Sequence, residues 1–92
     1  MIPMERIRSV KLTGTTPSST TASNTVVNYP LDFTRDNCYV SAIGVEIQSD
    51  RPRFNDPNYP VAAIMLNSEI QVYIRDNAAA SKPFIMILTQ TF

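Results

Sequence analysis

The residues best suited to chemistry gather in one proline-rich segment, residues 51–60. It combines Arg51 and Arg53 with Phe54 and Tyr59, so guanidinium donors lie next to aromatic rings. Such a combination suits stacking against a sugar while its hydroxyls are hydrogen-bonded. It also suits a subunit contact, because Arg and Tyr are enriched among the residues that dominate protein interfaces. A rigid surface loop with solvated arginines explains the same pattern without a ligand, so three interpretations stay open.

The rest of the chain contains few residues of the types that catalytic and metal-binding sites need. The 92 residues include no His and one Cys, which excludes His-based triads, His-metal sites and Cys-based zinc sites built from this chain alone. The aspartates fall in predicted turns without the spacing of a calcium loop. They are Asp32, Asp36, Asp50, Asp56 and Asp76. We therefore expect no enzymatic activity, no cofactor and no metal.

Composition also narrows the classes of partner. Eight basic and eight acidic side chains cancel, which argues against the basic face of a nucleic-acid binder. No apolar run approaches the ~18 residues of a membrane span. Residues 1–12 lack the continuous apolar core of a signal peptide, so we expect synthesis in a cytoplasm without export. The expected partners exclude nucleic acid and membrane.

Alternating apolar and polar residues, together with one short apolar run at residues 61–66, predict an all-β fold. A helical turn is possible in that run, but Pro60 and Asn67 on either side favour a buried strand. The candidate strands are residues 24–29, 38–48, 61–66, 68–75 and 84–92. Turn residues separate them, and their short, regular spacing favours a single small antiparallel β-sandwich of jelly-roll-like topology.

The strand expected at residues 38–48 is the longest. One face is expected to carry Tyr39, Ser41, Ile43, Val45 and Ile47. Gly44 suggests a bulge or a close backbone contact in this strand. Cys38 fits a small buried hydrophobic residue better than a reactive thiol.

Two segments precede these strands. Residues 1–12 fit either an arm that packs on a neighbouring subunit or an edge strand, because their apolar and charged residues do not alternate cleanly. Residues 13–92 are expected to form the sandwich domain, which includes a loop rich in Ser and Thr at residues 13–25.

Residues 28–40 carry a distinctive pattern that includes YPLDFTRDN. It resembles small β modules of phage tail and head fibres, in which a YPxxFTxDN segment precedes a long hydrophobic strand. In those modules a later loop rich in Asn and Ala leads through Lys-Pro into a final apolar strand, and residues 76–88 match this description. Tyr29, Pro30 and Phe33 are expected to be structural anchors, with Phe33 closing one end of the core.

The resemblance implies a non-enzymatic structural protein of a phage or prophage particle, such as a fibre, capsid decoration or baseplate subunit. Its expected location is the virion, after synthesis in the host cytoplasm. It would act by self-association and by docking on other virion proteins, and threefold fibre modules suggest a homotrimer. A small core without disulfide or metal, and a charged fraction of only 17%, agree with association. The alternative is a glycan- or receptor-binding module at a fibre tip, acting through Arg51, Arg53, Phe54 and Tyr59.

Overall fold

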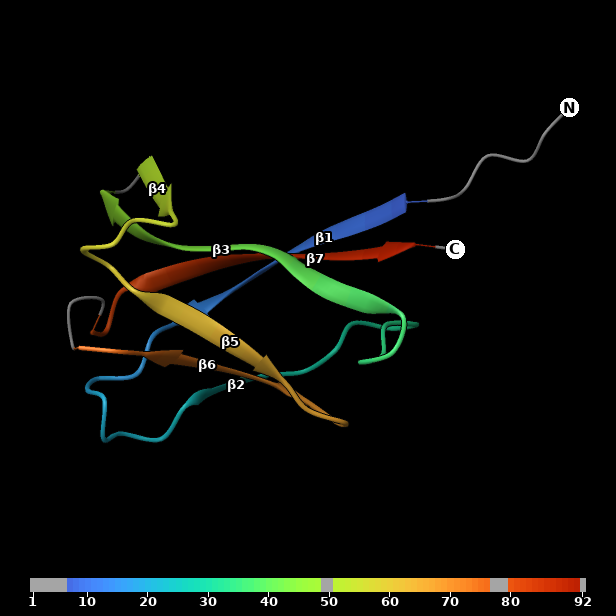
Figure 1. Ribbon diagram of the computed structural model, residues 1–92, viewed down its shortest axis with the longest axis horizontal. Coiled ribbons are helices and arrows are strands. Elements are labelled where there is room, and N and C mark those ends of the chain that lie inside the picture. Colours follow the sequence, from blue (N-terminus) through green and yellow to red (C-terminus); the bar gives the residue numbers. More distant parts are fainter. Residues whose placement is uncertain (1–6, 49–50, 77–79, 92) are drawn as a thin grey trace, which may run out of the picture.

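The computed structural model describes residues 7–48, 51–76 and 80–91, which form seven β-strands and no helix (Figure 1). The strands are β1 (Ile7–Thr15), β2 (Thr25–Val27), β3 (Cys38–Gln48), β4 (Arg51–Phe54), β5 (Val61–Met65), β6 (Ile70–Ile74) and β7 (Pro83–Thr91). They make a larger sheet in the order β1-β7-β3-β4 and a smaller sheet in the order β2-β6-β5. The predicted small antiparallel β-sandwich is confirmed.

The two sheets stack as layers, with β1 against β2 and β3 against β5. The final strand, β7, lies in the middle of the larger sheet between β1 and β3, so the first and last strands are neighbours (Figure 1). The chain crosses from the larger to the smaller sheet and back before it reaches β4. This jelly-roll-like topology uses seven strands, against eight in a full jelly roll.

The core lies where alternate residues of the two sheets face each other. Three residues of β7 (Phe84, Met86 and Leu88) meet three of β6 (Ile70, Val72 and Ile74), and all six are at most 4% exposed. Val45 from β3 and Phe33 from the loop before it complete the buried apolar set. Each such side chain stabilises the fold by roughly 1.5–3 kcal/mol on burial.

The side-chain faces of β3 differ from those expected. The register with β7 shifts between Val40 and Ala42, so Ser41 is an extra, bulged residue. Because a one-residue shift reverses which side chains point inward, Cys38 and Val40 pack against the core before the bulge, and Ile43 and Val45 after it. The expectation that Tyr39 shares a face with Ile43 and Val45 was wrong, and Tyr39 is 52% exposed.

The N-terminal part of the described chain is an edge strand. β1 begins at Ile7, pairs with β7 throughout, and continues to Thr15. It therefore passes the expected boundary at residue 12, and the Ser/Thr-rich loop occupies residues 16–24. Residues 1–6 of the expected arm and Phe92 of the expected last strand lie outside the described residues.

The segment that carries the YPLDFTRDN pattern forms a tight turn before β3. The Phe33 backbone N–H donates to the Pro30 carbonyl at 3.0 Å, and Asp32 adopts a φ of 71°. This positive φ suits the third position of a type II turn, and Asp tolerates it better than most residues do. The turn directs Phe33 into the core, where it is 4% exposed.

Side chains distant in sequence hold this turn in place. The Asp32 carbonyl accepts hydrogen bonds from Nε2 of Gln90 at 2.6 Å and from Nδ2 of Asn37 at 3.0 Å. The Tyr29 hydroxyl donates to the Leu66 carbonyl at 2.7 Å, which connects the segment to the smaller sheet. The guanidinium of Arg8 lies 5.0 Å from the centre of the Phe33 ring, within the range of a cation–π interaction.

Candidate functional site

The segment predicted as one loop, residues 51–60, divides into a strand and a turn. Arg51–Phe54 form β4, which pairs with the end of β3 at the edge of the larger sheet. The prediction of a loop at these four residues was wrong. Pro52 argued against a strand in the sequence, because proline lacks the N–H that a central strand needs. An edge strand such as β4 can accommodate it.

β4 directs its side chains to opposite sides of the sheet. Phe54 lies beside Gly44 on the side away from the smaller sheet, where a Cβ on Gly44 would come within 2.8 Å of the ring. Arg53 pairs with Val45, whose side chain is in the core. The Arg53 side chain therefore points toward the smaller sheet, on the side opposite to Phe54. The predicted residues Arg53, Phe54 and Tyr59 therefore do not form a single cluster, and Arg51 is exposed at the start of β4.

The turn after β4 is organised around Asp56. One carboxylate oxygen accepts the Asn58 backbone N–H at 2.9 Å, and the carbonyl of Asp56 accepts the Tyr59 N–H at 3.0 Å. The other carboxylate oxygen lies 3.6 Å from a guanidinium nitrogen of Arg53. Asn55, just before it, has a φ of 58°. These contacts fix the turn without a ligand, and they use the charge of Asp56 internally.

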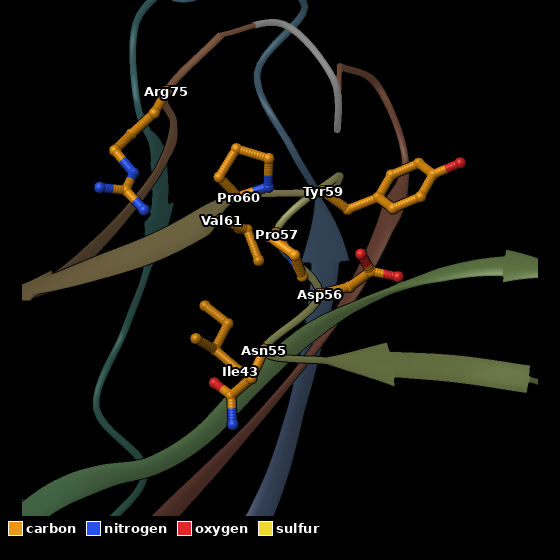
Figure 2. A pocket seen from close by; sticks show the side chains of 8 residues that line it. All are labelled: Ile43, Asn55, Asp56, Pro57, Tyr59, Pro60, Val61 and Arg75. Carbon is orange, nitrogen blue, oxygen red and sulfur yellow. The ribbon is translucent and has the colours of Figure 1, made fainter.

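A pocket of about 320 Å³ lies between this turn and the adjoining ends of β5 and β6. It is lined by Ile43, Asn55, Asp56, Pro57, Tyr59, Pro60, Val61 and Arg75. Figure 2 shows Arg75 on one side and Asn55 on the other, with Pro57, Pro60 and Val61 between them. The Tyr59 ring points away from Arg75. The backbone N–H of Arg75 donates to the Pro60 carbonyl at 3.3 Å, which joins the end of β6 to the start of β5.

Arg75 is the cation of the pocket lining. Asp56 is paired with Arg53, whereas the guanidinium of Arg75 has no ion pair with any residue in the described ranges. Arg75 is also exposed, so its donors are accessible from solvent. The arrangement can hold an anion against an apolar wall.

A second surface is the outer face of the larger sheet, the side turned away from the smaller sheet. Its central strand contributes Ile85, Ile87 and Thr89. The hydroxyl of Thr89 lies 3.0 Å from that of Ser9 on β1 and 2.8 Å from that of Ser41 on β3. The Ser41 hydroxyl also donates to the Ile87 carbonyl at 3.1 Å, so the bulge is tied to the neighbouring strand.

Charges are sparse on this outer face. The strand alternation places Lys11 of β1 and Glu46 of β3 there, because Val10, Leu12 and Val45 beside them pack inward. Neither Lys11 nor Glu46 forms an ion pair with another described residue. The remaining described side chains on this face are uncharged, and Phe54 and Tyr39 are 40% and 52% exposed.

The only shifted pKa values among the described residues lie away from both surfaces. Burial raises the pKa of the Cys38 thiol, which donates to the Thr34 carbonyl at 2.9 Å. Burial also raises the pKa of Tyr29, with Cys38 as the next contribution. The described residues contain no cluster of three or more His, Cys, Asp or Glu side chains that would hold a metal ion.

Of the residues predicted to form the site, only Tyr59 lines the pocket, although the predicted segment 51–60 also contains four other lining residues. Tyr59 belonged to the predicted site, but Ile43 and Arg75 reach the pocket from β3 and the end of β6 only through the sandwich topology. The Asp56-Pro57 pair, which is typical of turns, was the one sequence feature that indicated the side of the pocket near Asn55. Nothing in the local sequence distinguishes Arg75 from the arginines of β4.

Comparison of the chain with models of protein families, with curated proteins and with solved structures found no match. Among the described residues there is no helix long and apolar enough to cross a membrane.

Proposed function

We propose that the chain is a non-enzymatic structural subunit of a phage or prophage particle that associates through the outer face of its larger sheet. The phage assignment is supported by the resemblance of the YPLDFTRDN segment to fibre modules. The self-association is supported by one observation: Lys11 and Glu46 are unpaired within the described chain and are symmetrically placed on an otherwise uncharged face.

The sheet register gives this symmetry. Thr13, Ile85 and Gly44 lie in one row across β1, β7 and β3. On β1, Lys11 comes two residues before the row residue Thr13. On β3, at the other side of Ile85, Glu46 comes two residues after the row residue Gly44. With ideal strand spacings, their Cα atoms are about 16 Å apart, too far for an ion pair within one copy.

A twofold axis through Ile85 brings the two charges together between copies. It places Lys11 of each copy opposite Glu46 of the other, with Ile85 and Ile87 at the centre. For ideal spacings, the strands of the two sheets then cross at about 70°, which is closer to the orthogonal than to the aligned geometry of sheet packing. In a homotrimer, which the resemblance leads us to expect, Lys11 of each copy would instead face Glu46 of the next copy around the ring.

The contact is small, and its affinity is expected to be modest. Three strands over seven residues cover roughly 14 by 23 Å, or about 330 Å² per copy, below the roughly 800 Å² per partner of a standard interface. Such a contact suits an assembly in which subunits are already concentrated on a particle. We therefore expect association at high micromolar concentration rather than at nanomolar concentration.

Light scattering with charge-exchange variants tests the self-association. The wild-type mass should rise with concentration, and K11E or E46K alone should reduce the association. The double variant K11E/E46K should restore it, because the opposite charges still meet. Arg35→Glu is the matched control, since Arg35 is an exposed residue in the turn before β3. A wild-type chain that stays monomeric at near-millimolar concentration contradicts the self-association.

The particle assignment has its own test. When the gene is expressed from its own prophage or phage, the chain should co-sediment with purified particles and resist removal by high salt. Recovery of the chain only in the soluble fraction would contradict a structural role in the virion.

A further inference from the structure

The pocket beside the β4–β5 turn has the features of a binding site that the proposed self-association does not use. Its lining residue from the larger sheet, Ile43 of β3, packs toward the core, whereas the proposed contact uses the outer face of that sheet. From its geometry we propose that it binds a single carboxylate-bearing sugar unit, of the uronic acid type.

The charge of the pocket selects a singly charged anion. Arg75 is the one cation in the lining that lacks an ion pair among the described residues, and Asp56 opposite is already paired with Arg53. A guanidinium matches the planar fork of a carboxylate, to which it donates two parallel hydrogen bonds. A phosphate group, with nearly two charges at neutral pH, would leave about one charge uncompensated here.

The apolar and amide side chains of the lining suit a sugar ring as the uncharged part of the ligand. Pro57, Pro60 and Val61 form an apolar surface between Arg75 and Asn55 (Figure 2). A sugar ring presents C–H groups to such a surface and hydroxyl groups at its edge, and the Asn55 amide both donates and accepts hydrogen bonds. The hydrogen bonds of Asp56 hold the backbone of this wall in place before binding, with Asn55 at a φ of 58°. Little backbone conformational entropy is therefore lost in ordering this wall.

The size of the pocket limits the ligand to about one sugar unit. Its volume of about 320 Å³ is at the lower end of the range for small-molecule sites. A uronic acid has about 13 non-hydrogen atoms, and the efficiency typical of larger ligands gives a dissociation constant of about 1 mM. A polymeric glycan on a particle with many copies of the chain would bind more tightly through multivalency.

The test is a titration of the isotope-labelled full chain, followed by amide chemical shifts. Glucuronate and glucose differ in the carboxylate, so glucuronate should give saturable shifts at Asn55, Val61 and Arg75 with a dissociation constant of about 1 mM, and glucose much smaller shifts. Acetate should bind more weakly than glucuronate, because it lacks the ring. Arg75→Gln should weaken glucuronate binding about tenfold or more, and Arg35→Gln should leave it unchanged.

The spectrum of each variant reports its own folding, so loss of binding is separated from loss of structure. Equal shifts from glucose and glucuronate would overturn the proposal, as would tighter binding of inorganic phosphate. Unchanged binding by Arg75→Gln, or shifts confined to residues outside the pocket, would also overturn it. The pocket and the outer face are tested with different variants, so the binding result can be interpreted whatever the oligomeric state of the chain.

Discussion

Replacement of Gln90 by Met should leave the fold as stable as before or make it more stable, although it removes a hydrogen bond. Gln90 has no exposed surface, and its Nε2 donates to the Asp32 carbonyl, but its Oε1 has no hydrogen-bond partner. A buried acceptor without a partner costs about 1–3 kcal/mol, whereas one hydrogen bond contributes about 0.5–1.5 kcal/mol. Methionine has nearly the same length and volume and removes both terms at once. The expected change is a stabilisation of about 0–2 kcal/mol.

The Asp32 carbonyl makes this balance favourable. After the substitution it still accepts a hydrogen bond from Nδ2 of Asn37 at 3.0 Å, so it is not left without a donor. Asn37→Ala should therefore cost more in the Gln90→Met background than in the wild type, because the carbonyl then loses both donors. The coupling in this double-mutant cycle should be about 0.5–1 kcal/mol.

Urea denaturation followed by circular dichroism measures these differences, and the slope m should not change. A domain of this size gains about 4–8 °C in Tm for each kcal/mol. Leu88→Met is the matched control: Leu88 is a neighbouring fully buried residue on the inner face of β7, and the exchange should cost less than about 1.5 kcal/mol. A loss of 1 kcal/mol or more for Gln90→Met, beyond that control, would refute the reasoning and indicate that Oε1 has a donor such as a bound water.

Three further predictions follow from the packing. Gly44→Ala should destabilise the fold by about 1–3 kcal/mol, because its Cβ would meet the Arg53 carbonyl and force β4 away from β3; unchanged urea stability would contradict this contact. Phe33→Ala should cost about 3–5 kcal/mol in the same assay, since it opens the end of the core, and a cost below 1 kcal/mol would show that the turn packs loosely. Because burial raises the pKa of Cys38, its alkylation by iodoacetamide at pH 8 should be slower in the folded chain than in urea and should accelerate as the pH rises; equal rates would contradict a protected thiol. The same raised pKa means that Cys38 favours the folded state least at alkaline pH, above the pKa of the unfolded thiol.

Four of the five strands from residue 38 onward were predictable, because a two-residue alternation or a short apolar run between turn residues marks them, whereas β4 was not predicted. β3, β5, β6 and β7 begin and end within two residues of the expected bounds. The side-chain faces of β3 were not predictable, because the bulge at Ser41 depends on hydrogen bonds to β7. A single inserted residue leaves the pattern of apolar residues intact while it reverses which of them point inward.

The binding surfaces were less accessible to sequence reasoning than the strands. The arginines and aromatic rings near Pro52 suggested one site, yet strand alternation sends Arg53 and Phe54 to opposite sides. Arg75 was missed because its position depends on the pairing of β6 with β5, which brings it beside Pro60. Local composition indicated which residues are capable of binding, while the topology determined which of them meet.

The position of β7 has a consequence for how the chain folds. The middle of the larger sheet is its last strand, so β1 and β3 have no common neighbour until that strand is in place. Ile7 pairs with Thr91, and such long-range pairing requires the closure of nearly the whole chain before it stabilises anything. We expect folding on the slow timescale of β-sandwiches, milliseconds to seconds, with open strand edges in the intermediates. A nascent chain would therefore be prone to aggregate until its final strand is inserted.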